Sequence, residues 1–354
     1  MTYPEPPPRV TRRRFIGITA MMAAGGFMPS ARGAVLQPVI WRGRAMGADA
    51  TITLYHSQRE IADALLARCR HTISHLENQL SLHQPGSALC RLNRDGMLDN
   101  APDALLDILR LAADINQSTD GSFDVTVQPL WQLYSSHFAQ AGADPEGPSQ
   151  ADITAARSHV DARAIIIQGN RINFAGPGMA VTLNGIAQGY ITDQVAQLLH
   201  AAGMDNVLLD LGEFRALGPS PSGRAWRVGI RDPRAPWQLM DRIALRQGAI
   251  ATSGGYGTQF DPSGRFHHLF DPAIGRSAQY YRSVSIYGPD AARADALSTG
   301  LSAQPLDKAM AVLHELGPDW GGVFVGQNGS VFRHNWPGQG AADSTGTAGV
   351  GALL

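Results

Sequence analysis

Short segments with the patterning of strands and of amphipathic helices follow one another irregularly along this chain, and this order restricts its fold most. The clearest helical pattern covers residues 58–80, where apolar residues recur at spacings of three and four. Between residues 164 and 334, several short strand-like segments are interspersed with further helical ones. Because strict βαβ alternation is absent, we predict an α+β fold. A chain of 354 residues, 44% of them hydrophobic, is long enough to bury a large core.

Turn and capping residues indicate several element boundaries. Pro102 is typical of the start of a helix, and Gly169-Asn170 is typical of a two-residue turn between strands. Residues 137–152, rich in Gly, Pro and Ala, are predicted to form a surface loop. Further helices are predicted at 186–202, 289–302 and 305–316. Strands are predicted at 50–55, 164–168, 171–174, 207–211, 226–231, 242–245, 249–252, 283–287, 321–326 and 330–334.

The N-terminus has the features of an export signal. TRRRFIG, residues 11–17, matches a twin-arginine motif, and the apolar run that follows is shorter than the roughly 20 residues a membrane span needs. Ala31 and Gly33 are small residues at the −3 and −1 positions of a cleavage site. The alternative is a basic disordered arm before a core helix. We expect residues 1–33 to be a signal for export to the periplasm, 34–336 to form one compact domain, and 337–354 to be a flexible tail.

Charge and cysteine content exclude some classes of function. The formal net charge of −1 gives no basic field that would favour nucleic acid. Neither Cys69 nor Cys90 follows the apolar run, so no lipid anchor is expected. The two cysteines could form one disulfide, but Cys69 lies on the apolar stripe of a predicted helix, and a buried free thiol is at least as well supported. No CxxC spacing supports a zinc site.

Two of the four polar segments that could carry chemistry contain turn-forming residues. TDGSFDVTVQPL, residues 119–130, places an Asp-Gly turn before a Phe-Asp pair and, on composition alone, is typical of a β-turn that leads into a strand. LNGIAQGYITD, residues 183–193, places small residues before a predicted helix, where a ligand can approach the backbone and a helix N-terminus can hold phosphate. This segment matches no common phosphate-binding motif, and tight helix packing explains its glycines equally well.

The other two segments contain histidines and a carboxylate. HHLFDPAIG, residues 267–275, follows ATSGGY, residues 251–256. Adjacent histidines point to opposite faces of an extended segment, so His267 and His268 are not expected to serve one site, and a zinc hydrolase built on both is disfavoured. In ADALST, Asp295 and Thr299 share one helix face. Their hard oxygens suit Mg²⁺ rather than zinc, and the alternative role of Asp295 is an interaction with the helix dipole.

Taken in order, these segments resemble those of the FAD:protein FMN transferase family, over about residues 40–335. Met46-Gly47 is similar to the family's opening Met-Gly-Thr, with Ala48 in place of Thr, and residues 81–93 are similar to its Ser-x-aromatic…Ser…Leu-Asn segment. DGSFDVTVQPL, SGGY, HHLFDP with Gly275, and ADALST follow in the family's order and spacing. The resemblance implies a single domain of mixed sheets and helices that transfers FMN from FAD to a protein hydroxyl and releases AMP.

The resemblance also implies roles for particular residues. Mg²⁺ would bridge the FAD pyrophosphate, held by Asp295, Thr299 and the carbonyl of Gly185. His268 and Asp295 would be catalytic, with His268 or a carboxylate near Asp295 as the base. Contacts with the substrate FAD are implied at Met46, His83, Ser122, Phe123, Asp124, Thr182, Gln188, Ser253 and His268.

Some positions depart from the family pattern. Thr182, Asn184 and Gln188 stand where the family usually has Asp, Gly and Lys, and Gly212-Glu213 stands where it has Gly-Gly. With a twin-arginine signal and no lipid anchor, the chain resembles a subgroup accessory to nitrous oxide reductase maturation. The implied partner of that subgroup is a membrane-bound regulatory flavoprotein with a Thr or Ser acceptor. Two alternatives remain open: an FAD pyrophosphatase, and an FAD carrier with little turnover.

Overall fold

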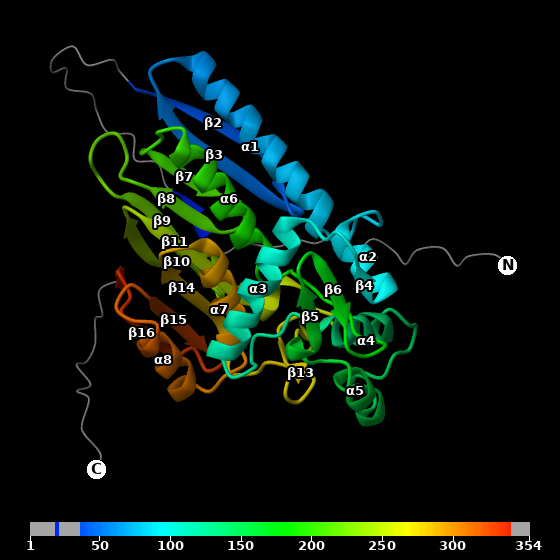
Figure 1. Cartoon of the computed structure of the whole chain (residues 1–354). Helices are drawn as coiled ribbons and strands as arrows, with labels where there is room; N and C mark the ends of the chain where they lie inside the picture. The colour runs from blue at the N-terminus through cyan, green and yellow to red at the C-terminus, as the bar shows by residue number, and fades with distance from the viewer. Residues whose placement is uncertain (1–17, 21–35, 341–354) are drawn as a thin grey trace.

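The computed structural model describes residues 18–20 and 36–340 and is built around one large antiparallel sheet. Figure 1 shows this sheet running diagonally through the molecule with helices packed against it. In spatial order its strands are β16 (Val331–His334), β15 (Gly321–Gly326), β14 (Tyr281–Gly288), β11 (Gly248–Gly254), β8 (Phe214–Leu217), β7 (Val207–Asp210), β3 (Ala48–His56) and β2 (Gln37–Ala45). Met46 and Gly47 join β2 to β3 as a two-residue turn in which both have positive φ, a geometry that matches the twist of the strands.

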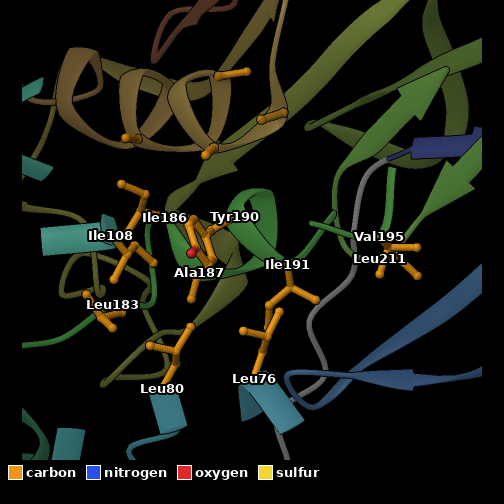
Figure 2. Packing of buried hydrophobic residues seen from close by; sticks show 14 of the residues in the cluster. Leu76, Leu80, Ile108, Leu183, Ile186, Ala187, Tyr190, Ile191, Val195 and Leu211 are labelled. Carbon is orange, nitrogen blue, oxygen red and sulfur yellow. The ribbon is translucent and has the colours of Figure 1, made fainter. Parts of the chain in front are cut away.

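Helices cover one face of the large sheet and form the main core with it. They are α1 (Arg59–Leu80), α3 (Asp103–Ser118), α6 (Ala187–Ala201), α7 (Ala291–Leu301) and α8 (Leu306–Glu315). α6 lies in the middle of this layer, and most of its residues are buried. Figure 2 shows Leu76 and Leu80 of α1 and Ile108 of α3 gathered around it. A helix that is enclosed on this many sides is held rigidly, which suits it to position a site.

A smaller sheet covers the other face. In spatial order its strands are β1 (Ile18–Ala20), β9 (Trp226–Asp232), β10 (Ala235–Leu245) and β17 (Gly338–Gly340). Phe214 and Ile250 of the large sheet pack with Trp226, Val228 and Ile243 of the smaller one in a separate core. β1 and β17 are parts of the predicted export signal and tail. The rest of that signal, and residues 341–354 of the tail, lie outside the described residues.

An aromatic cluster occupies a lobe beside the sheets. The lobe contains α4 (Gln128–Phe138), α5 (Gln150–Arg157), β12 (Phe270–Asp271) and β13 (Arg276–Ser277). Tyr134 of α4 contacts Phe260, Phe266 and Phe270, with ring centroids 5.2 to 6.0 Å apart. Because Phe266 and Phe270 flank the histidine pair in sequence, this cluster anchors the segment that carries His267 and His268. α2 (Ala88–Asp95) and a three-stranded sheet of β4 (Met97–Leu98), β6 (Arg171–Phe174) and β5 (Ile165–Gln168) complete the fold.

The layers of helices and antiparallel sheets confirm the predicted α+β class. The predicted helices and most of the predicted strands are present within two residues of their expected bounds. β10 is longer than predicted. Its first half contains Pro236 and two register shifts, and this irregular part lacks the strand pattern on which the prediction was based. α2, α4, α5 and β2 were not predicted.

The strand predicted from the composition of residues 119–130 is wrong. Asp120 and Gly121, both at positive φ, form the expected turn, but the chain then makes a second turn and enters α4 at Gln128. Asp124 accepts a hydrogen bond from the backbone N–H of Thr126 at 2.7 Å, which bends the segment. Pro129 then lies in the first turn of the helix, where its missing N–H costs nothing.

Both cysteines are free thiols. Cys69 is fully buried in the main core, and burial raises the pKa of its thiol to about 11, so it stays protonated. Cys90 is half-buried, and its Sγ donates to the carbonyl of Ser81. The structure therefore contains a buried thiol at Cys69 rather than a disulfide. Among the residues described, no helix has both the length and the apolar character needed to cross a membrane.

Asp210 at the end of β7 makes stability depend on pH. Burial, with a smaller contribution from the negative charge of Asp49, raises the pKa of its carboxyl from 3.8 to about 7. Between pH 3.8 and about pH 7, the folded chain therefore keeps a proton on Asp210 that the unfolded chain has lost. The free energy of unfolding falls as pH rises across this range. We expect Asp210→Asn to raise the free energy of unfolding by roughly 2 kcal/mol near pH 8 and not near pH 4. Urea unfolding of the unmodified and variant proteins at both pH values measures this change in the free energy of unfolding. The same change at both pH values would contradict the prediction.

Candidate functional site

A cavity lies where the turn after α3, the first turn of α6, the end of β11 and one face of α7 meet. These elements are far apart in sequence, and the packing of the helices against the large sheet brings them together. We call this the inner cavity. Of the predicted site residues, it brings together Phe123, Asp124, Thr182, Gly185, Gln188, Ser253, His268, Asp295 and Thr299.

α6 and α7 cross at a glycine, and this crossing builds one wall of the inner cavity. A Cβ atom on Gly189 would lie 2.2 Å from the carbonyl oxygen of Ala291, so no other residue allows the two backbones to approach this closely. The N–H of Gly189 donates to Oδ2 of Asp295 at 3.1 Å. In return, the carboxylate of Asp193 on α6 accepts from the N–H groups of Ala291 and Ala292 at the start of α7. Each helix thus orients a carboxylate of the other.

We expect Gly189→Ala to lower the free energy of unfolding by roughly 2–4 kcal/mol, because the new methyl group must push two helices apart. The separation would also break the hydrogen bond that orients Asp295. Thermal unfolding measures the stability loss. Gly176→Ala is the matched control, because its added Cβ meets nothing within 4 Å and it should change stability by less than about 0.5 kcal/mol. A Gly189→Ala protein as stable as this control would show that the crossing tolerates a side chain.

The three predicted metal ligands lie together. Asp295 and Thr299 are one turn apart on α7, and a Cβ on Gly185 would lie 2.8 Å from Oγ1 of Thr299. The absence of a side chain at Gly185 therefore lets the loop before α6 approach the Thr299 hydroxyl. No cluster of three or more His, Cys, Asp or Glu suited to a metal occurs among residues 18–20 and 36–340. A carboxylate, a hydroxyl and a peptide carbonyl fit Mg²⁺, which keeps several waters and completes its shell with phosphate oxygens.

The inner cavity is acidic. Asp124, Glu213 and Asp295 line it, and no Lys or Arg is among its lining residues in the described part of the chain. The carboxylate of Asp124 accepts from Thr126 and from the N–H of Ala162, while burial raises its pKa. A ligand that carries phosphates therefore needs a bound cation to offset repulsion from these carboxylates.

The two adjacent histidines have different surroundings, as predicted. His267 is buried outside the cavity lining, its Nδ1 accepts from the N–H of Leu269, and burial lowers the pKa of its ring. His268 lines the inner cavity, and its Nδ1 lies 3.1 Å from the carbonyl oxygen of Thr258. Since a carbonyl only accepts, Nδ1 donates, and the lone pair of the neutral ring is on Nε2. This contact therefore sets the tautomer of the neutral ring, with Nε2 as its basic nitrogen.

A second, more open cavity adjoins the first, and we call it the outer cavity. Trp131 and Asn184 line both cavities, and His83 and Arg94 line only the outer one. His83, predicted as an FAD contact, thus lies next to the inner cavity rather than in it.

The structure places neither Met46 nor Ser122 among the lining residues of these cavities. Met46 lies in the β2–β3 turn, where its N–H donates to the carboxylate of Glu77. Ser122 lies in the turn before Phe123, and its N–H donates to the carbonyl of Thr119.

Among the residues of the inner cavity that sequence reasoning did not assign to the site are Glu213, Tyr256 and Trp131. Glu213 is only 6% exposed and its Oε2 accepts from the N–H of Thr252 at 3.3 Å. Burial and the negative charge of Glu213 raise the pKa of Tyr256 to about 12, so the phenol stays protonated. The sequence signal for Glu213 was its position, because it is a charged residue directly after an apolar strand and a glycine.

Comparisons with known proteins agree with this geometry. Residues 46–322 match the model of the ApbE family. An FAD:protein FMN transferase of Vibrio cholerae is 31% identical over 281 residues, which cover 76% of this chain and 82% of that protein. One of Treponema pallidum is 31% identical over 291 residues, covering 76% and 80%. The crystal structure of the ApbE protein from Thermotoga maritima superimposes with a TM-score of 0.74 at 26% identity, covering 84% of this chain and 97% of that one.

The fold and these relatives together define an enzyme of the transferase class. The match over residues 46–322 identifies it further: the chain belongs to the ApbE family. This confirms the family predicted from the motifs. The comparisons do not test the subgroup linked to nitrous oxide reductase, which stays a prediction.

Proposed function

We propose that this protein transfers FMN from FAD to a Thr or Ser hydroxyl of a target flavoprotein, in a reaction that needs Mg²⁺ and releases AMP. The observation that carries the proposal is that Asp295, Thr299 and Gly185, which offer hard oxygen atoms, line a cavity with no Lys or Arg among its described lining residues. The relatives named FAD:protein FMN transferases support the choice of reaction.

The reaction is a displacement at phosphorus. The acceptor oxygen forms a bond to the phosphorus of the FMN half of FAD, and the bond from that phosphorus to the bridging oxygen breaks. AMP leaves with the bridging oxygen. A bound Mg²⁺ would offset the negative charge of the pyrophosphate. Asp295 and Thr299 would hold it from α7, and the carbonyl of Gly185 would hold it from the loop before α6.

His268 takes the role of proton acceptor in this proposal. The attacking hydroxyl must lose its proton as the new P–O bond forms. The hydrogen bond from Nδ1 to the carbonyl of Thr258 sets the tautomer in which Nε2 is basic, and the ring lines the cavity that contains Asp295. The outer cavity, which contains His83, would hold another part of the FAD.

The test is incubation of the chain with FAD, Mg²⁺ and an acceptor domain that contains a Thr or Ser flavinylation site. We expect flavin fluorescence on the denatured acceptor and an equimolar amount of AMP. AMP and free FMN without labelled protein would instead establish an FAD pyrophosphatase.

A carrier with little turnover is the second candidate, and Thr182 and Gln188 favour it. Both are uncharged residues in the inner cavity where the family pattern has Asp and Lys. A carrier would retain one FAD per chain through gel filtration and release no AMP. Release of AMP in step with labelling would exclude it.

The same proposal includes a periplasmic location and a membrane-bound acceptor linked to nitrous oxide reductase maturation. The twin-arginine motif at residues 11–17 supports export of the folded chain. Fractionation of cells that produce the full chain tests the location, and recovery only with the cytoplasmic contents would contradict it.

A further inference from the structure

A chain of three hydroxyl groups connects the Thr299 side chain to the backbone of α7. Oγ of Ser253, at the end of β11, lies 3.1 Å from Oγ1 of Thr299 and 2.7 Å from Oγ of Ser298. Oγ of Ser298 in turn lies 2.9 Å from the carbonyl oxygen of Asp295. Ser298 is fully buried, and it is not among the residues that line the described cavities.

The carbonyl at the end of the chain determines the direction of every bond in it. A carbonyl oxygen only accepts, so Ser298 donates its single proton to the carbonyl of Asp295. Ser298 therefore has no proton for Ser253, and Ser253 must donate across the 2.7 Å contact. Ser253 in turn has no proton for Thr299, so Thr299 donates to Ser253. Each hydroxyl has one proton, and the chain uses all three.

This direction matters because a metal cation binds the lone pairs of a hydroxyl and is repelled by its proton. With its proton directed at Ser253, Thr299 keeps its lone pairs for the inner cavity, which it lines. In the reverse direction, Ser253 would donate to Thr299, and the Thr299 proton would be free to turn into the cavity.

We propose that Ser298 and Ser253 form a hydroxyl relay that directs the lone pairs of Thr299 toward the cation site. Ser298 does not line the cavity, so it is a positioning residue for Thr299, the proposed metal ligand. The inference rests on the proposed Mg²⁺ site of Asp295, Thr299 and Gly185. It adds a buried residue whose hydroxyl is connected to the Thr299 hydroxyl through Ser253. In Ser298→Ala, Ser253 loses its acceptor and becomes able to donate to Thr299.

The test measures cation binding directly, with Mn²⁺ as the probe and the full chain in the presence of FAD. Electron paramagnetic resonance of free Mn²⁺ gives a Kd that does not depend on turnover. We expect Ser298→Ala to raise this Kd on the order of tenfold, as loss of a group that orients a metal ligand does. Ser285→Ala is the matched control. Ser285 is equally buried and its hydroxyl contacts Thr252, the residue next to Ser253, at 2.8 Å. It should leave the Kd within about twofold of the unmodified chain.

A second variant keeps the test valid if Ser298→Ala folds poorly. Ser253→Ala removes the middle hydroxyl at a half-buried position and should weaken Mn²⁺ binding to a similar degree. Adding Ser298→Ala to it should cause no further loss, because in the relay the Ser298 hydroxyl influences Thr299 through Ser253. Unchanged binding in Ser298→Ala, or additive losses in the double variant, would overturn the relay. Absence of Mn²⁺ binding by the unmodified chain would instead overturn the metal site and, with it, the relay.

Discussion

Asp295→Ala is expected to reduce FMN transfer on the order of a thousandfold, even at saturating FAD. Its carboxylate is the only charged ligand in the proposed cation site, and it is 5% exposed, in a cavity where charge interactions are poorly screened. Loss of the cation removes several kcal/mol of stabilisation of the charge on the pyrophosphate, which corresponds to a rate loss of this size. Initial rates of acceptor labelling, measured across a series of Mg²⁺ concentrations, give the result.

Asp295→Asn separates the metal role from the structural one. An amide oxygen can still accept from the N–H of Gly189, so the crossing of α6 and α7 is retained, but the charge is lost. We therefore expect normal thermal stability and nearly the same rate loss as in the alanine variant. Asp290→Asn is the control on the same helix, since it caps the N-terminus of α7 and an asparagine can keep that cap. Full transfer by Asp295→Asn, with its Mg²⁺ dependence unchanged, would contradict the assignment.

His268→Gln is expected to slow transfer by about 10²–10⁴-fold while FAD binding changes little. Glutamine fills similar space and can hydrogen-bond, but it cannot take the proton of the attacking hydroxyl. Quenching of flavin fluorescence measures FAD binding, and single-turnover labelling measures the chemical step. A parallel loss of binding and rate would mean that His268 holds FAD rather than accepts a proton.

His267→Gln is the control for this experiment. His267 is adjacent in sequence but buried outside the cavity lining, where its Nδ1 accepts from the N–H of Leu269. This variant should lower stability through the altered segment and leave the single-turnover rate of the folded fraction within about threefold. An equal rate loss in both variants would trace the effect to the segment 267–275 as a whole rather than to the ring of His268.

Local patterns predicted the long elements well because each of them is encoded in its own residues. The spacing of apolar residues over 58–80 corresponds to α1, and the Gly169-Asn170 turn between β5 and β6 is present. The failures lie in short or irregular segments. Residues 119–130 have the composition of a strand but belong to no sheet of the described structure. A hydrogen bond from the N–H of Thr126 to the Asp124 carboxylate, and Pro129 in the first turn of α4, decide their conformation instead.

The features of the site likewise divide into those that local sequence determines and those that it does not. Asp295 and Thr299 share a face because they are four residues apart on one helix, which the sequence alone determined, as it did the separate surroundings of His267 and His268. Only the tertiary structure decided that Gly189 meets Asp295, that Ser253 meets both Ser298 and Thr299, and that Glu213 enters the same cavity. Periodicity reports which side of an element is buried, whereas these contacts depend on how closely two helices and a strand approach, and that distance is set by packing across the whole core.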